Sequence, residues 1–161
     1  SYCFMFNLTG CAFRFGNVVG ARQTHGVGFD FVRRLMHDPE RLHILGDGSQ
    51  SKSYIHISDV VNAVLHANRY CLKPFETFNV ATGDYITVTE IAELAVGCLA
   101  LAPRPVFEYS GGNRGWKGDV PIVRLNTDRI RALGWTCQRS TRDALRDSLV
   151  ALIDDVRNRL V

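Results

Sequence analysis

The sequence lacks the patterns that mark several common classes of protein. No run of apolar residues reaches the roughly 20 that a membrane-spanning helix needs. The five cysteines are odd in number and form no Cys-x-x-Cys pair, which is typical of small buried residues in a reducing compartment rather than of a disulfide framework. The apolar start has neither the basic end nor the cleavage site of a signal peptide. We therefore expect a cytoplasmic protein that does not enter a membrane.

Neither sign of charge is in large excess. Nineteen basic and sixteen acidic side chains leave a net charge of +3. Near the C-terminus the two signs alternate, which is typical of a solvated helix face and not of a stripe that binds nucleic acid. We expect no nucleic-acid partner.

The motifs of self-contained catalysts are also missing. The sequence has no Gly-x-Ser-x-Gly nucleophile elbow, no Walker loop and no Gly-x-Gly-x-x-Gly dinucleotide turn. The five histidines have no paired ligand spacing and no cysteine cluster beside them, so we expect no metal site. Binding residues, rather than catalytic ones, are what the sequence offers.

Alternating strand-like and helix-like segments predict an α/β fold. The predicted strands include residues 11–20, 42–45, 52–57, 77–82 and 105–109, and the predicted helices include residues 28–38, 59–71, 88–99 and 140–160. Thr87 and Glu90 have the spacing of a capping box, and Ser58 or Asp59 is expected to cap the helix that follows. The chain has no initiating Met and starts as if inside an element, so we expect a fragment of a longer protein.

Polar side chains gather at the ends of the predicted strands, where α/β proteins bind ligands. Lys52 and Arg114 are two separated cations that suit the oxygens of a diphosphate. Tyrosine and asparagine suit sugar hydroxyls or the edge of a base. These residue types predict a binding site for a small phosphorylated ligand.

Each of these residues also has a structural interpretation. Lys52 fits a solvated strand edge, Tyr54 a half-buried core position, and Asn17 a turn. Trp116 fits the edge of a core. His56 stands between two isoleucines, which favours a hydrogen-bonded core histidine over a general base.

Four segments occur in an order that resembles a known family. They are "RFGNVVGARQ", "ILGDGSQSKSYIHISDVVNAV", "TFNVATGDYITVTEIAEL" and "RGWKGDVPIVRLNTDRIRALGW". Together they resemble the C-terminal half of the NAD-dependent nucleoside-diphosphate-sugar epimerases and dehydratases, which are extended short-chain dehydrogenases/reductases. The resemblance covers nearly the whole chain from Arg14 onward.

The resemblance implies the C-terminal part of an extended short-chain dehydrogenase/reductase. Residues 1–27 would be the end of a Rossmann-type core. Residues 28–161 would be mainly a small α/β substrate-binding domain, with strands and helices that return to the core. In this family the N-terminal half carries the glycine turn for NAD and a catalytic Tyr-x-x-x-Lys. No tyrosine here is followed four residues later by lysine, so the resemblance implies no catalytic residue in this chain and NAD as the cofactor of the full-length protein.

Position by position, the resemblance assigns Phe15 to the side of the nicotinamide. The residues it assigns to the nucleotide sugar are Asn17, Lys52, Tyr54, Asn79, Arg114 and Asp119. Lys52 stands where the family usually has arginine. Arg114 lies farther from Asp119 along the chain than the family's arginine often does.

The expected function is that of the nucleotide-sugar-binding portion of an epimerase of the UDP-glucose 4-epimerase type, inactive by itself. Such an enzyme passes a hydride from C4 of the hexose to NAD and returns it after the ketone has turned. We expect a UDP-sugar as the ligand and a homo-oligomer as the assembly. Two alternatives stay open: a 4,6-dehydratase or reductase of the same fold, and a non-catalytic nucleotide-sugar-binding or interaction module.

Overall fold

A computed structural model describes residues 1–120 and 122–161 of the chain and shows the predicted α/β fold. The helices are α1 (Tyr2–Phe6), α2 (Val27–His37), α3 (Ile57–Tyr70), α4 (Val88–Leu99), α5 (Asp128–Ala132) and α6 (Thr141–Arg157). The strands are β1 (Gly10–Phe15), β2 (Asn17–Val19), β3 (Arg41–Ile44), β4 (Ser51–Lys52), β5 (Tyr54–His56), β6 (Phe75–Val80), β7 (Ile86–Thr87) and β8 (Val106–Tyr109).

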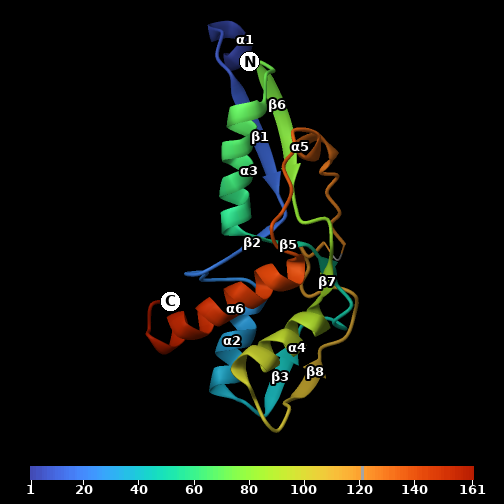
Figure 1. Cartoon of the computed structure of the whole chain (residues 1–161). Helices are drawn as coiled ribbons and strands as arrows, with labels where there is room; N and C mark the ends of the chain where they lie inside the picture. Colours follow the sequence, from blue (N-terminus) through green and yellow to red (C-terminus); the bar gives the residue numbers. More distant parts are fainter. Residues whose placement is uncertain (121) are drawn as a thin grey trace.

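The strands form four separate pairs. β1 pairs with β6, β2 with β5 and β3 with β8, all in parallel, while β4 pairs with β7 antiparallel. Figure 1 shows an elongated molecule: β1, β6, α3 and α5 make one half, and β3, β8, α2 and α4 make the other. The β2–β5 pair lies between them, with α6 close to it.

Each half has its own apolar core. One core is built mainly from α2, β3, α4 and α6 and includes Tyr54. The other is built mainly from α3, β6 and α5 and includes Ile55. Because successive side chains of a strand point to opposite sides, these neighbours on β5 are buried in different cores. The short strand β5 therefore joins the two halves.

The predicted strand over residues 52–57 is interrupted and ends one residue too late. It is broken at Ser53 into β4 and β5, and Ile57 is an exposed first residue of α3. The helix cap is His56, whose Nδ1 accepts the backbone N–H of Ser58 at 3.3 Å, so neither Ser58 nor Asp59 is the cap. Asp59 is buried instead, where its carboxylate accepts the backbone N–H of Gln138 at 3.2 Å.

The predicted strand at residues 11–20 is also less buried than its apolar pattern suggested. β1 has β6 as its one neighbour within the described chain, and Phe15 at its end is 41% exposed. The helix before it, α1, has no buried residue, and its aromatic side chains lie at the surface. An apolar pattern predicts a buried face only where a partner covers it.

The predicted capping box is confirmed. The Thr87 hydroxyl accepts the backbone N–H of Glu90 at 3.2 Å, and the Glu90 carboxylate accepts the backbone N–H of Thr87 at 2.8 Å. Among residues 1–120 and 122–161, no helix is both long enough and apolar enough to span a bilayer.

Truncation of Leu152 tests the importance of α6 for the first core. Leu152 is fully buried there, so Leu152→Ala should lower the free energy of unfolding by about 2 to 5 kcal/mol. Val150 on the same helix is half exposed, so Val150→Ala should lower it by less than about 1 kcal/mol. Urea denaturation of both variants checks this, and equal losses would contradict the burial of that helix face.

Candidate functional site

A cavity of about 420 Å³ opens beside the β2–β5 pair. Its walls come from β2, β5, the start of α2, the middle of α6 and the loop at residues 115–119. Four of the six residues predicted to bind the nucleotide sugar line it: Asn17, Lys52, Tyr54 and Asp119.

The parallel pairing of β2 with β5 brings the first of these residues together. Asn17 is the register partner of Tyr54. Ser53, the residue before Tyr54, lies 36 positions after Asn17 in the sequence. The Asn17 side-chain amide donates to the backbone carbonyl of Ser53 at 3.0 Å. This bond holds Asn17 at the edge of the cavity and leaves its carbonyl oxygen as an acceptor.

Lys52 and Asp119 form an ion pair in the cavity wall. Their Nζ and Oδ1 atoms are 2.5 Å apart, and the side chains are only 24% and 7% exposed. The other carboxylate oxygen accepts the backbone N–H of Gly115 at 3.1 Å. Burial raises the pKa of Asp119, but the hydrogen bond from Lys52, the Gly115 N–H and the Lys52 charge outweigh it and hold the pKa below its usual value. The Asp119 carboxylate is therefore ionised at neutral pH, and its contact with Lys52 fastens the 115–119 loop to β4.

Tyr54 lies on the cavity wall as a neutral phenol. Its burial, and secondly the negative charge of Asp119, raise the pKa of Tyr54 to about 12. Its backbone N–H donates to the Thr141 hydroxyl at 3.2 Å, which ties β5 to the first turn of α6. At neutral pH the phenol can donate or accept a hydrogen bond but cannot act as a base.

A sharp turn before β4 gives the cavity another polar residue. Gly46 has a φ of +84°, and a Cβ there would lie 1.8 Å from Nε2 of Gln50 and 3.2 Å from the carbonyl carbon of Arg114. Gln50 is buried and lines the cavity, with Nε2 donating to the Leu45 carbonyl at 3.3 Å. Its Oε1 has no partner among the described protein atoms, so it is available as an acceptor. Sequence reasoning missed Gln50 as a site residue, although it alternates with Lys52 and Tyr54.

Three residues assigned by resemblance lie outside the cavity lining. Phe15 stacks on Phe13 with ring centroids 5.9 Å apart. Asn79 donates to the Asn126 carbonyl at 2.8 Å, so its amide supports the segment before α5. Arg114 is exposed on the glycine-rich loop. Their roles toward cofactor and ligand stay predictions.

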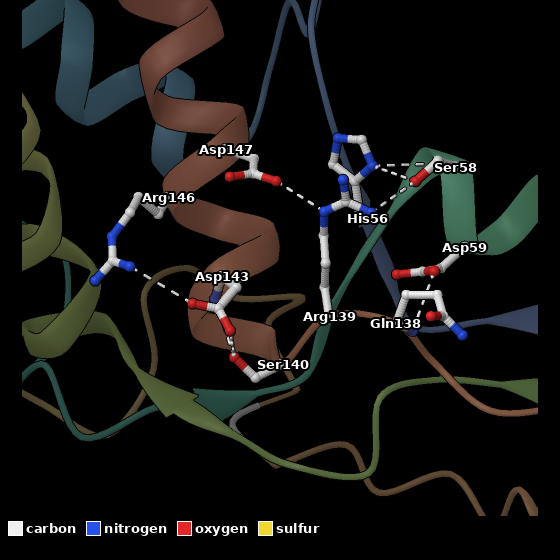
Figure 2. A network of polar contacts seen from close by, with 9 residues as sticks. All are labelled: His56, Ser58, Asp59, Gln138, Arg139, Ser140, Asp143, Arg146 and Asp147. Atoms are coloured by element: carbon white, nitrogen blue, oxygen red, sulfur yellow. Dashed lines mark hydrogen bonds and ion pairs between the residues drawn. The ribbon is translucent and has the colours of Figure 1, made fainter.

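A polar network joins the start of α3 to the start of α6, and it includes His56 (Figure 2). The His56 Nδ1 lies 2.8 Å from the Ser58 hydroxyl, and Arg139 donates to that same hydroxyl at 3.1 Å. Arg139 also donates to Asp147 at 2.7 Å. His56 is therefore hydrogen-bonded as predicted, since it caps α3 and belongs to a network that links the two halves, but it is only partly buried and is not a core residue.

Tyr54 should make the protein sensitive to alkali. Its pKa in the fold is about 12 against an ordinary 10.0, so its contribution to stability is complete below about pH 10 and is lost as the pH rises through 12. The loss should reach about 3 kcal/mol at most. Urea denaturation at stepped pH measures it. Tyr54→Phe should remove the part of the loss that belongs to Tyr54, while Cys137, whose pKa burial also raises to about 12, keeps its own part. Tyr2→Phe, at an exposed position, should leave the loss of stability at alkaline pH unchanged. If Tyr2→Phe reduces that loss as much as Tyr54→Phe does, the assignment to Tyr54 fails.

The chain's own residues do not compose a dinucleotide site. Phe15 is the one residue predicted to touch the nicotinamide, and it lies at the end of β1, away from the cavity lining. The cavity itself carries no turn of the Gly-x-Gly-x-x-Gly type that would hold a pyrophosphate on a helix N-terminus. The residues described here therefore do not fit NAD by themselves.

Comparison with known proteins agrees with this geometry. The model of the NAD dependent epimerase/dehydratase family matches residues 1–81. GDP-L-fucose synthase 1 of Arabidopsis thaliana is 30% identical over 134 residues, which are 80% of this chain and 38% of that protein.

Solved structures show the same similarity. A UDP-galactose 4-epimerase superposes with a TM-score of 0.81 at 30% identity, over 96% of this chain and 49% of that one. A UDP-glucose 4-epimerase from Thermotoga maritima, solved with UDP-glucose, superposes with a TM-score of 0.75 at 28% identity, over 99% and 50%. The resemblance predicted from the motifs is confirmed, and the chain spans about two fifths to one half of the length of these proteins.

Proposed function

Since the chain belongs to the NAD dependent epimerase/dehydratase family, we propose that it is the nucleotide-sugar-binding portion of a nucleoside-diphosphate-sugar epimerase of the UDP-glucose 4-epimerase type. The observation that carries the proposal is the shared cavity. Four residues from three separate segments line it: Asn17, then Lys52 and Tyr54, and then Asp119.

Lys52 is the group that binds the diphosphate. In the ligand-free protein its ammonium is neutralised by Asp119 at 2.5 Å. A diphosphate offers more negative charge and more acceptor oxygens than one carboxylate, so it can share Lys52 with Asp119. Because lysine is a point charge without the planar fork of arginine, it leaves the phosphate freer to change orientation than an arginine would.

Tyr54 and Asn17 orient the ligand beside that charge. The phenol of Tyr54 is neutral at physiological pH, so it can donate a hydrogen bond to a phosphate or hydroxyl oxygen. The Asn17 side chain uses its amide nitrogen in the bond to Ser53, so its carbonyl oxygen can accept a hydrogen bond from a hydroxyl. The rest of the cavity is lined by apolar residues of α2 and α6 together with polar ones, which include Asp30, Arg34 and Ser148. These residues bind and orient; none of them is placed to remove a proton from a sugar carbon.

A GDP-sugar is the second candidate ligand. GDP-L-fucose synthase 1 is among the curated proteins most similar to this chain, whereas the two solved structures described above are UDP-sugar epimerases. The residues around Lys52 recognise the diphosphate, which both ligands share. Binding of UDP and GDP must therefore be compared directly.

Substitution at Lys52 tests the proposed function. Lys52→Met should weaken UDP binding by about 10-fold or more, because a charge-assisted hydrogen bond in a half-buried site is lost. Lys52→Arg should bind UDP more tightly than the original protein, because the planar guanidinium offers two donors. Isothermal titration with UDP and with GDP measures both dissociation constants.

The matched control is Lys73→Met, which removes a lysine of the β1–β6 half that pairs with Glu76 and lies outside the cavity. It should leave both dissociation constants unchanged. Absence of UDP and GDP binding by the unsubstituted chain would overturn the proposed function, and unchanged affinity in Lys52→Met would remove Lys52 from it.

The chain by itself should have no turnover. It contains no Tyr-x-x-x-Lys, and its described residues do not fit NAD. Incubation with NAD and UDP-glucose, followed by chromatographic separation of UDP-glucose from UDP-galactose, should show no product. Formation of UDP-galactose above the level of a heat-denatured sample would contradict the assignment of this chain as a binding portion only.

A further inference from the structure

Trp116 is a large apolar side chain that the packing of the protein leaves unexplained. It is 68% exposed, and it lines the mouth of the cavity described above. The other tryptophan, Trp135, is buried in the second core. An exposed indole at the edge of a binding cavity is more costly in water than a polar residue there, and it is typical of a contact surface.

The loop around Trp116 is held so that the indole stays at the cavity. The Asp119 backbone N–H donates to the Trp116 carbonyl at 3.1 Å, which closes a tight turn, and the Asp119 carboxylate is fastened to Lys52. The Trp116 ring lies directly against Gly118, where an added Cβ would be 2.3 Å from the ring and would push the indole aside. The ion pair that neutralises Lys52 therefore also positions Trp116.

Leu45 forms the neighbouring apolar surface. It lines the same cavity, is about half exposed, and its Cβ lies 3.8 Å from the place that a Cβ on Gly115 would occupy. Arg114, one residue earlier in the loop, does not line the cavity. At this place the loop thus contributes an aromatic face to the cavity and not a second cation.

We infer that Trp116 stacks on the planar base of the bound nucleotide and thereby makes the site selective for nucleoside diphosphates over inorganic diphosphate. The inference rests on the proposed function, because it needs a ligand whose diphosphate lies at Lys52. A base that continues from that diphosphate toward the cavity mouth meets Trp116 and Leu45, which both offer apolar contact. Stacking on tryptophan is insensitive to the identity of the base, so UDP and GDP should share it.

The test compares UDP with inorganic pyrophosphate on the unsubstituted protein and three variants. Trp116→Ala should raise the dissociation constant of UDP by about 10-fold to 100-fold, the range that loss of one base–aromatic stack produces. It should leave the dissociation constant of pyrophosphate unchanged. Trp116→Phe keeps a smaller ring, so its dissociation constant for UDP should lie between those of the unsubstituted protein and Trp116→Ala. Lys117→Ala is in the same loop but outside the cavity lining and should bind both ligands normally.

Fluorescence gives an independent readout. UDP should quench the tryptophan emission of the unsubstituted protein, because the stacked indole is the exposed one, and pyrophosphate should not. Trp116→Phe retains the buried Trp135 as an internal reference, and its emission should not respond to UDP.

The outcomes separate the two proposals. If the unsubstituted protein binds neither UDP nor pyrophosphate, the proposed function falls, and this inference falls with it. If UDP binds normally to Trp116→Ala, or if UDP and pyrophosphate weaken equally in that variant, the stacking role is overturned while the proposed function stands. Selective loss of UDP binding in Trp116→Ala, together with loss of quenching in Trp116→Phe, supports the stacking role.

Discussion

The alternation of side chains along β5 is the constraint on which the rest of the structure depends. Tyr54 packs into one core and Ile55 into the other, so a strand of three residues holds both halves together. A shift of its register with β2 by one residue would exchange the two faces and bury the wrong side chain in each core. The cavity lies on the Tyr54 side of this strand, so its shape depends on the packing of both halves.

The second constraint is electrostatic. Lys52 and Asp119 are mostly removed from water, and such charges are stable only when they are paired. Their pairing brings the glycine-rich loop over the cavity, and that loop carries Trp116. A ligand with a diphosphate would share Lys52 with Asp119, so the loop stays fastened over the bound ligand.

Local patterns explain which parts of the fold and the site could be predicted from the sequence. The capping box at Thr87 was predictable because its hydrogen bonds join residues three positions apart. Lys52 and Tyr54 were found because they follow a glycine turn and begin a strand. By contrast, His56 replaces Ser58 as the cap of α3 because its ring reaches forward to the backbone N–H of Ser58, a geometry that spacing does not reveal. Phe15 is exposed because β1 has few neighbours, which an apolar pattern does not report.

By itself the sequence determined the α/β order of elements, the absence of a catalytic Tyr-x-x-x-Lys, and the family to which four ordered segments point. Only the tertiary structure decided which polar and aromatic side chains share the cavity. Trp116 lines it while Arg114 does not, and Asn79 bonds to the segment before α5 instead. The physical reason is that the cavity is closed by contacts such as Lys52 to Asp119, which join residues 67 positions apart, and such contacts depend on how the segments pack and not on any local pattern.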